Sequence, residues 1–100
     1  MISLLGFARK AGKLNLGSTA VEKSIKADKA RLVIITKDTS NNTKDKFYTK
    51  ASAKNIPIIE EYSRKELGNA LGKGDVSVVS TADEGFAKAI LKKWDGGNIE

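Results

Sequence analysis

The amino-acid sequence predicts an α/β protein, a three-layer α/β/α sandwich with a mostly parallel central sheet. Short apolar runs rich in β-branched residues, such as Leu32–Ile35, alternate along the chain with segments of helical spacing. This alternation is typical of parallel strands joined by helices, which then cover both faces of the sheet. A length of 100 residues suits one domain with its own core, so residues 1–100 are expected to form a single domain.

The N-terminal part of the chain predicts two helices and one short extended piece. Apolar residues at helical spacing over residues 4–11 indicate the first helix. Residues 13–16 are predicted to be extended, and Gly17 opens a second helix. Thr19 and Glu22 fit a capping box, in which a hydroxyl and a carboxylate each accept a hydrogen bond from a free backbone N–H.

The middle of the chain predicts a strand, a helix and a second strand. Residues 32–35 are all apolar, which is the pattern of a strand buried on both faces. A third helix passes through Phe47 and Ala51 and ends near Asn55, because the residue before a proline disfavours the helical conformation. Residues 58–59 form the next strand.

The C-terminal third repeats the pattern. Ser63 and Glu66 fit a capping box at the start of a fourth helix. Residues 76–79 are predicted to form a strand. Asp83 is placed to cap a last helix, whose broad apolar face extends to Trp94.

The composition excludes several kinds of chemistry. The sequence has no Cys and no His, which removes disulfides, the usual zinc sites and the Ser–His and Cys–His nucleophiles. Glu60 and Glu61 are adjacent in a predicted strand, so their side chains point to opposite faces and form no catalytic pair. The Gly-Lys-Gly sequence at residues 72–74 lacks the spacing and the ending of a P-loop. We therefore expect no catalysis, no metal and no cofactor.

The charge of the chain favours a phosphate-rich partner. Lys and Arg number 18 against 12 Asp and Glu, which gives a net charge of +6 and a pI near 9.6. A basic surface that serves only solubility is the alternative. No signal peptide and no apolar run of membrane-spanning length is visible, so we expect a cytoplasmic protein with no membrane contact.

The most informative segment is a group of cations just before a glycine. Arg9, Lys10 and Lys13 precede Gly17, which opens a helix, and Lys23 follows about one turn into that helix. The N-terminus of a helix offers unpaired N–H groups and partial positive charge, which together bind anions. The alternative is that the glycine serves only the turn and that the lysines form a solvated face.

This segment resembles the kink-turn RNA-binding family of ribosomal proteins, the L-seven-Ae type, in a bacterial form. The family has a basic Arg-Lys-x-Gly-Lys lead followed by Gly, a small residue, Asn, Glu, two variable residues and Lys. Residues 9–13 match the lead, while Gly17, Ser18 and Lys23 match three later positions. Further similarity lies at residues 31–35, 55–57 and 63–68.

The resemblance implies a monomeric, ribosome-associated protein, part of a ribonucleoprotein, that binds structured RNA. Kink-turn or related RNA, with ribosomal RNA one candidate, is the implied partner. Lys73, at the tip of a loop, is added as a further phosphate contact. The predicted RNA-binding residues are Arg9, Lys10, Lys13, Gly17, Ser18, Thr19, Lys23 and Lys73.

Two residues depart from the family pattern. Thr19 and Ala20 stand where the family has Asn and Glu, whose side chains contact the guanines of tandem G·A pairs. The loop at residues 72–75 is also more polar than the family's apolar loop. Phosphate contacts are therefore better supported than base contacts. The alternative function is a protein–protein interaction module on the same fold that has lost specific RNA readout.

Overall fold

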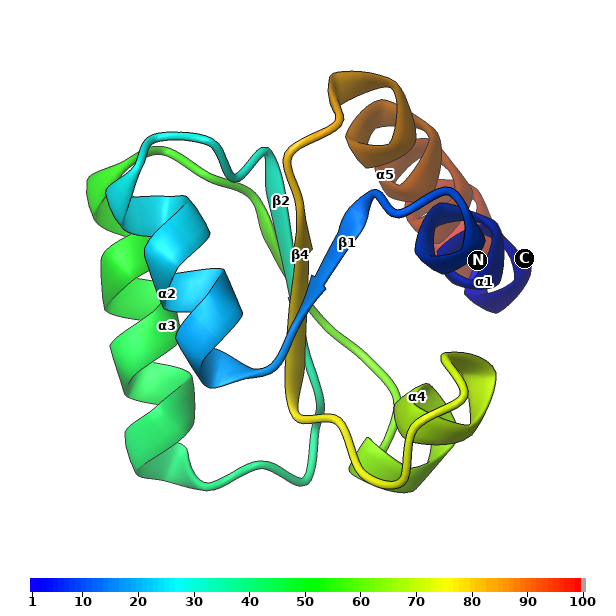
Figure 1. Ribbon diagram of the computed structural model, residues 1–100, viewed down its shortest axis with the longest axis horizontal. Coiled ribbons are helices and arrows are strands. Elements are labelled where there is room, and N and C mark those ends of the chain that lie inside the picture. The colour runs from blue at the N-terminus through cyan, green and yellow to red at the C-terminus, as the bar shows by residue number, and fades with distance from the viewer. Residues whose placement is uncertain (100) are drawn as a thin grey trace.

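The structure is a computed structural model that describes residues 1–99, with the side chains of residues 1–94. Across the described residues, five helices surround a four-stranded sheet (Figure 1). The elements in chain order are α1 (Ile2–Lys10), β1 (Leu14–Leu16), α2 (Ser18–Lys26), β2 (Leu32–Ile35), α3 (Asn41–Ala53), β3 (Ile58–Glu60), α4 (Arg64–Ala70), β4 (Val78–Thr81) and α5 (Glu84–Ile99).

The sheet is mixed, so the prediction of a mostly parallel sheet was wrong. The strand order is β1-β4-β2-β3, and only β2 and β3 pair in parallel. β4 lies between β1 and β2 and is antiparallel to both. β1, β2 and β3 therefore all run in one direction, as the alternation of strands and helices predicts, and β4 alone is reversed.

The reversal of β4 follows from the connection that precedes it. Ile35, at the end of β2, pairs with Glu60 at the end of β3 and with Val78 at the start of β4. The chain thus leaves β3 and enters β4 at the same end of the sheet. A helical crossover must carry the chain back along the whole strand, but α4 has 7 residues and spans only about 10 Å.

Helices cover both faces of the sheet, which confirms the layered architecture. Figure 1 shows α2 and α3 on one face and α1, α4 and α5 on the other. β2 supplies both layers, since Leu32 and Ile34 pack in one apolar cluster and Val33 and Ile35 in the other. All four are buried, as the sequence predicted for a central strand.

The start of α2 differs from the prediction. The N-cap is Gly17, with φ 90° and ψ 161°, and no side chain caps the helix. The Thr19–Glu22 capping box is therefore wrong, because the helix begins at Ser18 and both residues already lie inside it. The carboxylate of Glu22 instead forms an ion pair with Lys46 of α3.

Other boundaries agree closely with the sequence. The capping box of α4 is present, and the Asp83 carboxylate accepts a hydrogen bond from the Phe86 N–H at 2.8 Å. β4 begins two residues later than predicted. Val76, which the prediction included in the strand because it is apolar, packs in the core before the strand begins. No helix among the described residues has the length and apolar character needed to cross a membrane.

Candidate nucleic-acid interface

The start of α2 opens into a hollow that we call the α2 mouth. This hollow has a volume of about 300 Å³ and is lined by Leu16, Gly17, Ser18, Lys73, Asp75, Val76 and Ser77. Because no side chain caps α2, the first-turn N–H groups of the helix have no side-chain partner. The mouth therefore combines free backbone donors, the positive end of a helix dipole and a lysine.

Gly17 holds the backbone in a conformation that other residues avoid. Its φ of 90° with ψ of 161° lies in a region that is essentially restricted to glycine. The Gly17 N–H donates to the Val78 carbonyl at 2.9 Å, which fixes the turn against β4. A Cβ at this position would meet no atom within 4 Å, so the space in front of the turn is open.

The loop between α4 and β4 forms the opposite wall of the mouth. The Lys73 N–H donates to the Gly68 carbonyl at 2.8 Å, which folds the loop back onto its own helix. A Cβ on Gly68 would lie 2.1 Å from the Gly74 carbonyl oxygen, so only glycine allows this close approach. Gly68 therefore allows the loop to fold back onto α4, and this positions Lys73 at the mouth.

The charges of the mouth are mixed. Lys73 is exposed and carries a positive charge where an anion would approach the helix. Asp75 lines the same hollow and opposes that anion. For a phosphate to bind here, its attraction to the N–H groups of α2 and to Lys73 must therefore exceed its repulsion by the Asp75 carboxylate.

The three cations before Gly17 do not all meet at the mouth. The Arg9 Nε lies 3.5 Å from the Leu71 carbonyl oxygen, a long contact at the base of the Lys73 loop. Lys13 lies at the other end of β1, about 13 Å from Gly17 along the strand, with its Nζ 4.0 Å from an Asp83 carboxylate oxygen. Lys10 is exposed at the end of α1.

The remaining predicted residues lie on α2. Ser18 lines the mouth, and Thr19 is exposed on the first turn. Lys23 lies further along the helix, where it lines a second hollow together with Ala20. The structure thus brings Gly17, Ser18 and Lys73 together, and distributes the other predicted residues around this centre.

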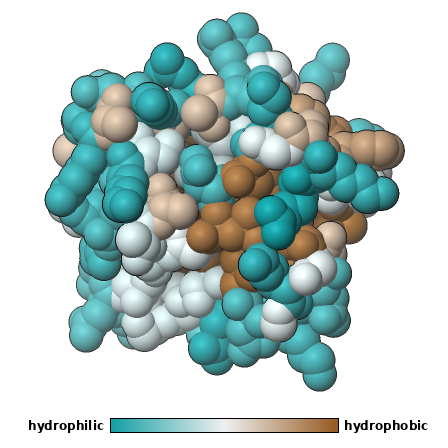
Figure 2. All heavy atoms as spheres, in the orientation of Figure 1, coloured by the Kyte–Doolittle hydropathy of each residue, from teal (hydrophilic) through white to brown (hydrophobic). Residues whose placement is uncertain are grey.

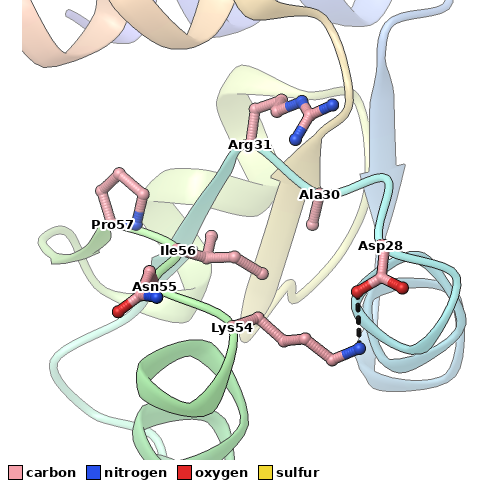
Figure 3. A pocket seen from close by; sticks show the side chains of 7 residues that line it. All are labelled: Asp28, Ala30, Arg31, Lys54, Asn55, Ile56 and Pro57. Carbon is pink, nitrogen blue, oxygen red and sulfur yellow. Dashed lines mark hydrogen bonds and ion pairs between the residues drawn. The ribbon is translucent and has the colours of Figure 1, made fainter.

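The other side of α2 is neutralised by ion pairs. A hydrogen bond from Lys46 lowers the pKa of Glu22 below its ordinary value of 4.5. At the far end of α2 and α3, Lys54 forms an ion pair of 2.5 Å with Asp28 (Figure 3). Arg31 lines a hollow together with Asp28 and Lys54, but its side chain points away from that ion pair (Figure 3). Lys46 and Lys54, which pair with carboxylates, are therefore less available to a ligand than Lys73 at the mouth.

The described part of the chain offers no candidate metal centre. Among the residues that the structure describes, no group of three or more His, Cys, Asp or Glu side chains gathers closely enough to hold a metal ion. Several carboxylates are instead paired with lysines on the surface, as Glu60 is with Lys44 at 3.0 Å. The donors that converge are backbone N–H groups and cations, which bind anions.

Sequence reasoning missed two features of this surface. It did not foresee that Gly68 holds the Lys73 loop, because that contact joins a helix to the loop that follows it. It also missed that Ala20, Lys23, Ser24 and Ala27 share one hollow face of α2. The spacing of three, four and seven residues was the signal for that shared face.

These features define a small α/β protein in which a helix N-terminus without a side-chain cap opens beside a lysine. The chain belongs to the ribosomal protein L7Ae/L30e/S12e/Gadd45 family, whose sequence model matches residues 1–91. This confirms the family resemblance found in the sequence.

Several relatives extend the comparison. The chain is 37% identical over 92 residues to "RNA-binding protein YlxQ" of Bacillus subtilis (strain 168), covering 92% of each chain. It is also 37% identical over 95 residues to "RNA-binding protein YlxQ" of Enterococcus faecium, covering 95% of this chain and 91% of that one. Both relatives thus match this chain along nearly their whole length.

Solved structures show the same fold. A Bacillus halodurans protein described as of unknown function matches with a TM-score of 0.88 and 33% identity, covering 91% of this chain and 92% of that one. The Giardia lamblia 15.5kD RNA binding protein matches with a TM-score of 0.78, covering 95% and 84%. Its identity is 19%, so this second likeness concerns the fold alone.

Proposed function

We propose that this protein binds structured RNA of the kink-turn or a related kind through phosphate contacts at the α2 mouth. The observation that carries the proposal is a helix N-terminus without a side-chain cap that opens opposite Lys73. Backbone N–H groups at such a terminus bind phosphate readily. The names of the Bacillus and Enterococcus relatives, both called RNA-binding proteins, support the same partner.

The contacts favour the RNA backbone over the bases. Ala20 has no side-chain acceptor for a guanine edge, and Thr19 offers a hydroxyl where the family has an amide. Phosphate contacts set affinity and position, whereas contacts to base edges set sequence preference. We therefore propose a binding role without catalysis, in which the shape of the RNA matters more than its sequence.

Association with the ribosome is the cellular setting that we propose. The family description, which begins with ribosomal proteins, supports it. Sedimentation of the protein with ribosomal subunits through a sucrose gradient at low salt tests this part separately. A protein that stays at the top of the gradient with both subunits would contradict it.

The central experiment measures the affinity of the protein for a labelled kink-turn RNA as a function of salt. Lys73→Ala should weaken binding and lower the slope of log affinity against log salt by about one unit, because one phosphate contact at the α2 mouth is lost. Lys88→Ala is the matched control, because Lys88 lies on α5 beside Glu84 and outside the proposed interface. Equal slopes for the parent and Lys73→Ala would contradict a phosphate contact at the α2 mouth.

A second RNA tests the preference for shape. The same duplex with its tandem G·A pairs replaced no longer forms the kink. We expect the parent to bind it more weakly than the kink-turn RNA, and both affinities to fall as salt rises. Equal affinity for the two RNAs would limit the function to general phosphate binding.

An apolar surface supports a protein contact as the second candidate function. Phe7, on α1, is 67% exposed, which is unusual for so large an apolar side chain. Figure 2 shows hydrophobic atoms gathered near the middle of one face, surrounded by hydrophilic ones. If the parent binds neither RNA, while Phe7→Ser abolishes association with a partner protein, this candidate replaces the first.

A further inference from the structure

The outer side of β3 is an unpaired sheet edge. β3 is the last strand in the order of the sheet, so only β2 pairs with it. The Pro57 carbonyl accepts a hydrogen bond from β2 at 3.0 Å, and the Glu61 N–H donates one to β2 at 3.0 Å. Because backbone groups along a strand point alternately to its two sides, those of Ile58 and Glu60 point away from the sheet. Neither of these two N–H groups donates to a described residue.

This edge lacks most of the devices that prevent a strand from pairing with another chain. Such devices include a proline or a charge on the edge and a bulge in the strand. Pro57 turns its carbonyl, and with it its nitrogen, toward β2, so the missing N–H lies on the inner side. The Glu60 carboxylate is paired with Lys44 and accepts a hydrogen bond from the Tyr48 hydroxyl, both at 3.0 Å. Only the short length of β3 remains as protection.

The face of α3 beside this edge is hollow and its lining is uncharged. Four exposed residues line an open hollow of about 590 Å³ there: Tyr48, Thr49, Ser52 and Ala53. The hydrogen bond from Tyr48 to Glu60 shows that this face borders the outer side of β3. Lys46 lies on the other side of α3, where it pairs with α2. In a chain of net charge +6, a second copy meets less repulsion at this uncharged face than at a face of exposed lysines.

We propose that a second copy of this chain pairs with the outer edge of β3, in the antiparallel direction, about a two-fold axis at Ile59. Ile58 then lies opposite Glu60 of the second copy, and each such pair exchanges two N–H···O hydrogen bonds. The contact is self-complementary, as a two-fold axis requires, and it satisfies every outward backbone group of β3. Two four-stranded sheets become one continuous sheet.

The same axis brings the two α3 helices side by side. Tyr48 lies level with Glu60, to which its hydroxyl donates, and Ser52 lies one turn further along α3, toward the start of β3. Since Glu60 is opposite Ile58 of the second copy, Tyr48 is opposite Ser52 of the second copy. Helices that each cover two strands lie about 10 Å apart, which is close to the usual packing distance of helices. The Tyr48 ring of each copy therefore fills the hollow of the other.

This interface leaves the α2 mouth free. β3 and β1 are the two outer strands of the sheet, and the mouth lies at the end of β1. A strand of 3 residues and one helix face form a small interface, so the dissociation constant should be on the order of 10 µM to 1 mM. The chain is a monomer at low concentration, as the family resemblance implies, and a dimer at high concentration.

Sedimentation velocity of the full chain tests the dimer. The mean mass of the parent should rise from that of one chain, 10.8 kDa, toward twice that value. The rise should fall between about 5 µM and about 1 mM protein. A parent that keeps the mass of one chain at the highest concentration overturns the proposal. The measurement needs no RNA, so its outcome is separate from that of the proposed function.

Ser52→Lys tests the place of the contact. It should raise the dissociation constant at least about tenfold, because a charge without a partner enters a contact that excludes water. Ser3→Lys is the matched control, since Ser3 is exposed on α1 and the change of charge is the same. Both serines are exposed, so both variants should fold. If the two variants dimerise equally well, the contact lies elsewhere and the proposal is overturned.

Amide hydrogen exchange, followed by NMR, tests the pairing of the strand without any substitution. The N–H groups of Ile58 and Glu60 should exchange at least about tenfold more slowly in concentrated than in dilute protein, because hydrogen bonds form only in the dimer. The Leu16 N–H is the internal control. It points outward from β1, because the Gly17 N–H that follows donates to β4, and its exchange should not depend on concentration. A dimer in which Ile58 and Glu60 exchange as fast as in the monomer would overturn the pairing of β3.

Discussion

The N-termini of α2 and α4 differ in how their free N–H groups are satisfied. At α4, the Ser63 hydroxyl accepts from the Glu66 N–H at 3.1 Å, and the Glu66 carboxylate accepts from the Ser63 N–H at 2.8 Å. At α2, Gly17 stands in the cap position and no side chain accepts from the first turn. One helix is closed by its own residues, and the other is left open.

Under the proposed function, the difference separates a helix end that stabilises the fold from one that is left open to bind phosphate. A side-chain cap stabilises a helix by about 1 kcal/mol, so α2 forgoes this contribution. An open N-terminus attracts anions, which a capped one does less well because its donors are occupied. Ser40 caps α3 in the ordinary way, whereas α1, like α2, has no side-chain cap.

The largest expected effect concerns the α4 loop that faces α2. Gly68→Ala should lower the free energy of unfolding by about 1–3 kcal/mol, because the added Cβ would collide with the Gly74 carbonyl. It should also weaken RNA binding, since Lys73 moves with the loop. Chemical denaturation and RNA titration measure the two effects.

Gly6→Ala is the control for that variant. Gly6 lies inside α1, where a Cβ would make an ordinary contact at 3.9 Å. Alanine should therefore stabilise this helix, by up to about 1 kcal/mol. If both variants lose stability equally, the close approach at Gly68 is not the cause.

Substitutions at the two N-caps test the comparison directly. Gly17→Ala should lower the free energy of unfolding by about 1–3 kcal/mol because of its φ of 90°, and should weaken RNA binding by the folded protein. Ser63→Ala should cost about 1 kcal/mol and leave the RNA affinity unchanged. Equal RNA affinities for the two variants would show that the open cap does not bind RNA.

A smaller effect is expected from the carboxylate at the α2 mouth. Asp75→Asn should raise RNA affinity about twofold to fivefold, because one exposed charge that repels phosphate is removed. Asp45→Asn, on the exposed side of α3, changes the net charge equally and controls for the overall field. An equal gain in RNA affinity in both variants would show that the net charge of the protein, and not the carboxylate at the α2 mouth, causes the effect.

The smallest effect concerns pH. The chain has no His, so RNA affinity should stay constant from about pH 6 to pH 9. Hydrogen bonds from Lys46 and Lys37 lower the pKa values of Glu22 and Glu61 below 4.5. Their stabilising contribution is therefore complete above pH 4.5 and is lost as the pH falls through the lowered pKa values.

Melting curves between pH 7 and pH 3 measure this loss. Glu22→Gln should remove part of the acid sensitivity, because an amide does not titrate. A variant that loses stability with acid as steeply as the parent would show that the ion pair with Lys46 contributes nothing measurable. A change of RNA affinity between about pH 6 and pH 9 would indicate that another titrating group, outside the ion pairs of Glu22 and Glu61, affects RNA binding.

The sequence alone determined much of the fold because the patterns involved are local. The apolar run of β2 and the capping box at Ser63 and Glu66 each depend on residues within one or two turns of chain. The family resemblance and the importance of Gly17 were also visible in the sequence. In each case a short spacing carried the information.

Only the tertiary structure decided how these local pieces meet. The reversal of β4 depends on where a short α4 returns the chain, and the hydrogen bond from the Gly17 N–H to the Val78 carbonyl fixes the start of α2 against β4. The same holds for Lys13, which lies beside Asp83 and not at the α2 mouth, and for Ser24, whose buried hydroxyl has no hydrogen-bond partner among the described residues. Contacts between residues far apart in the chain leave no periodic pattern, so the direction of a strand and the partners of a charge become known only when the sheet is assembled.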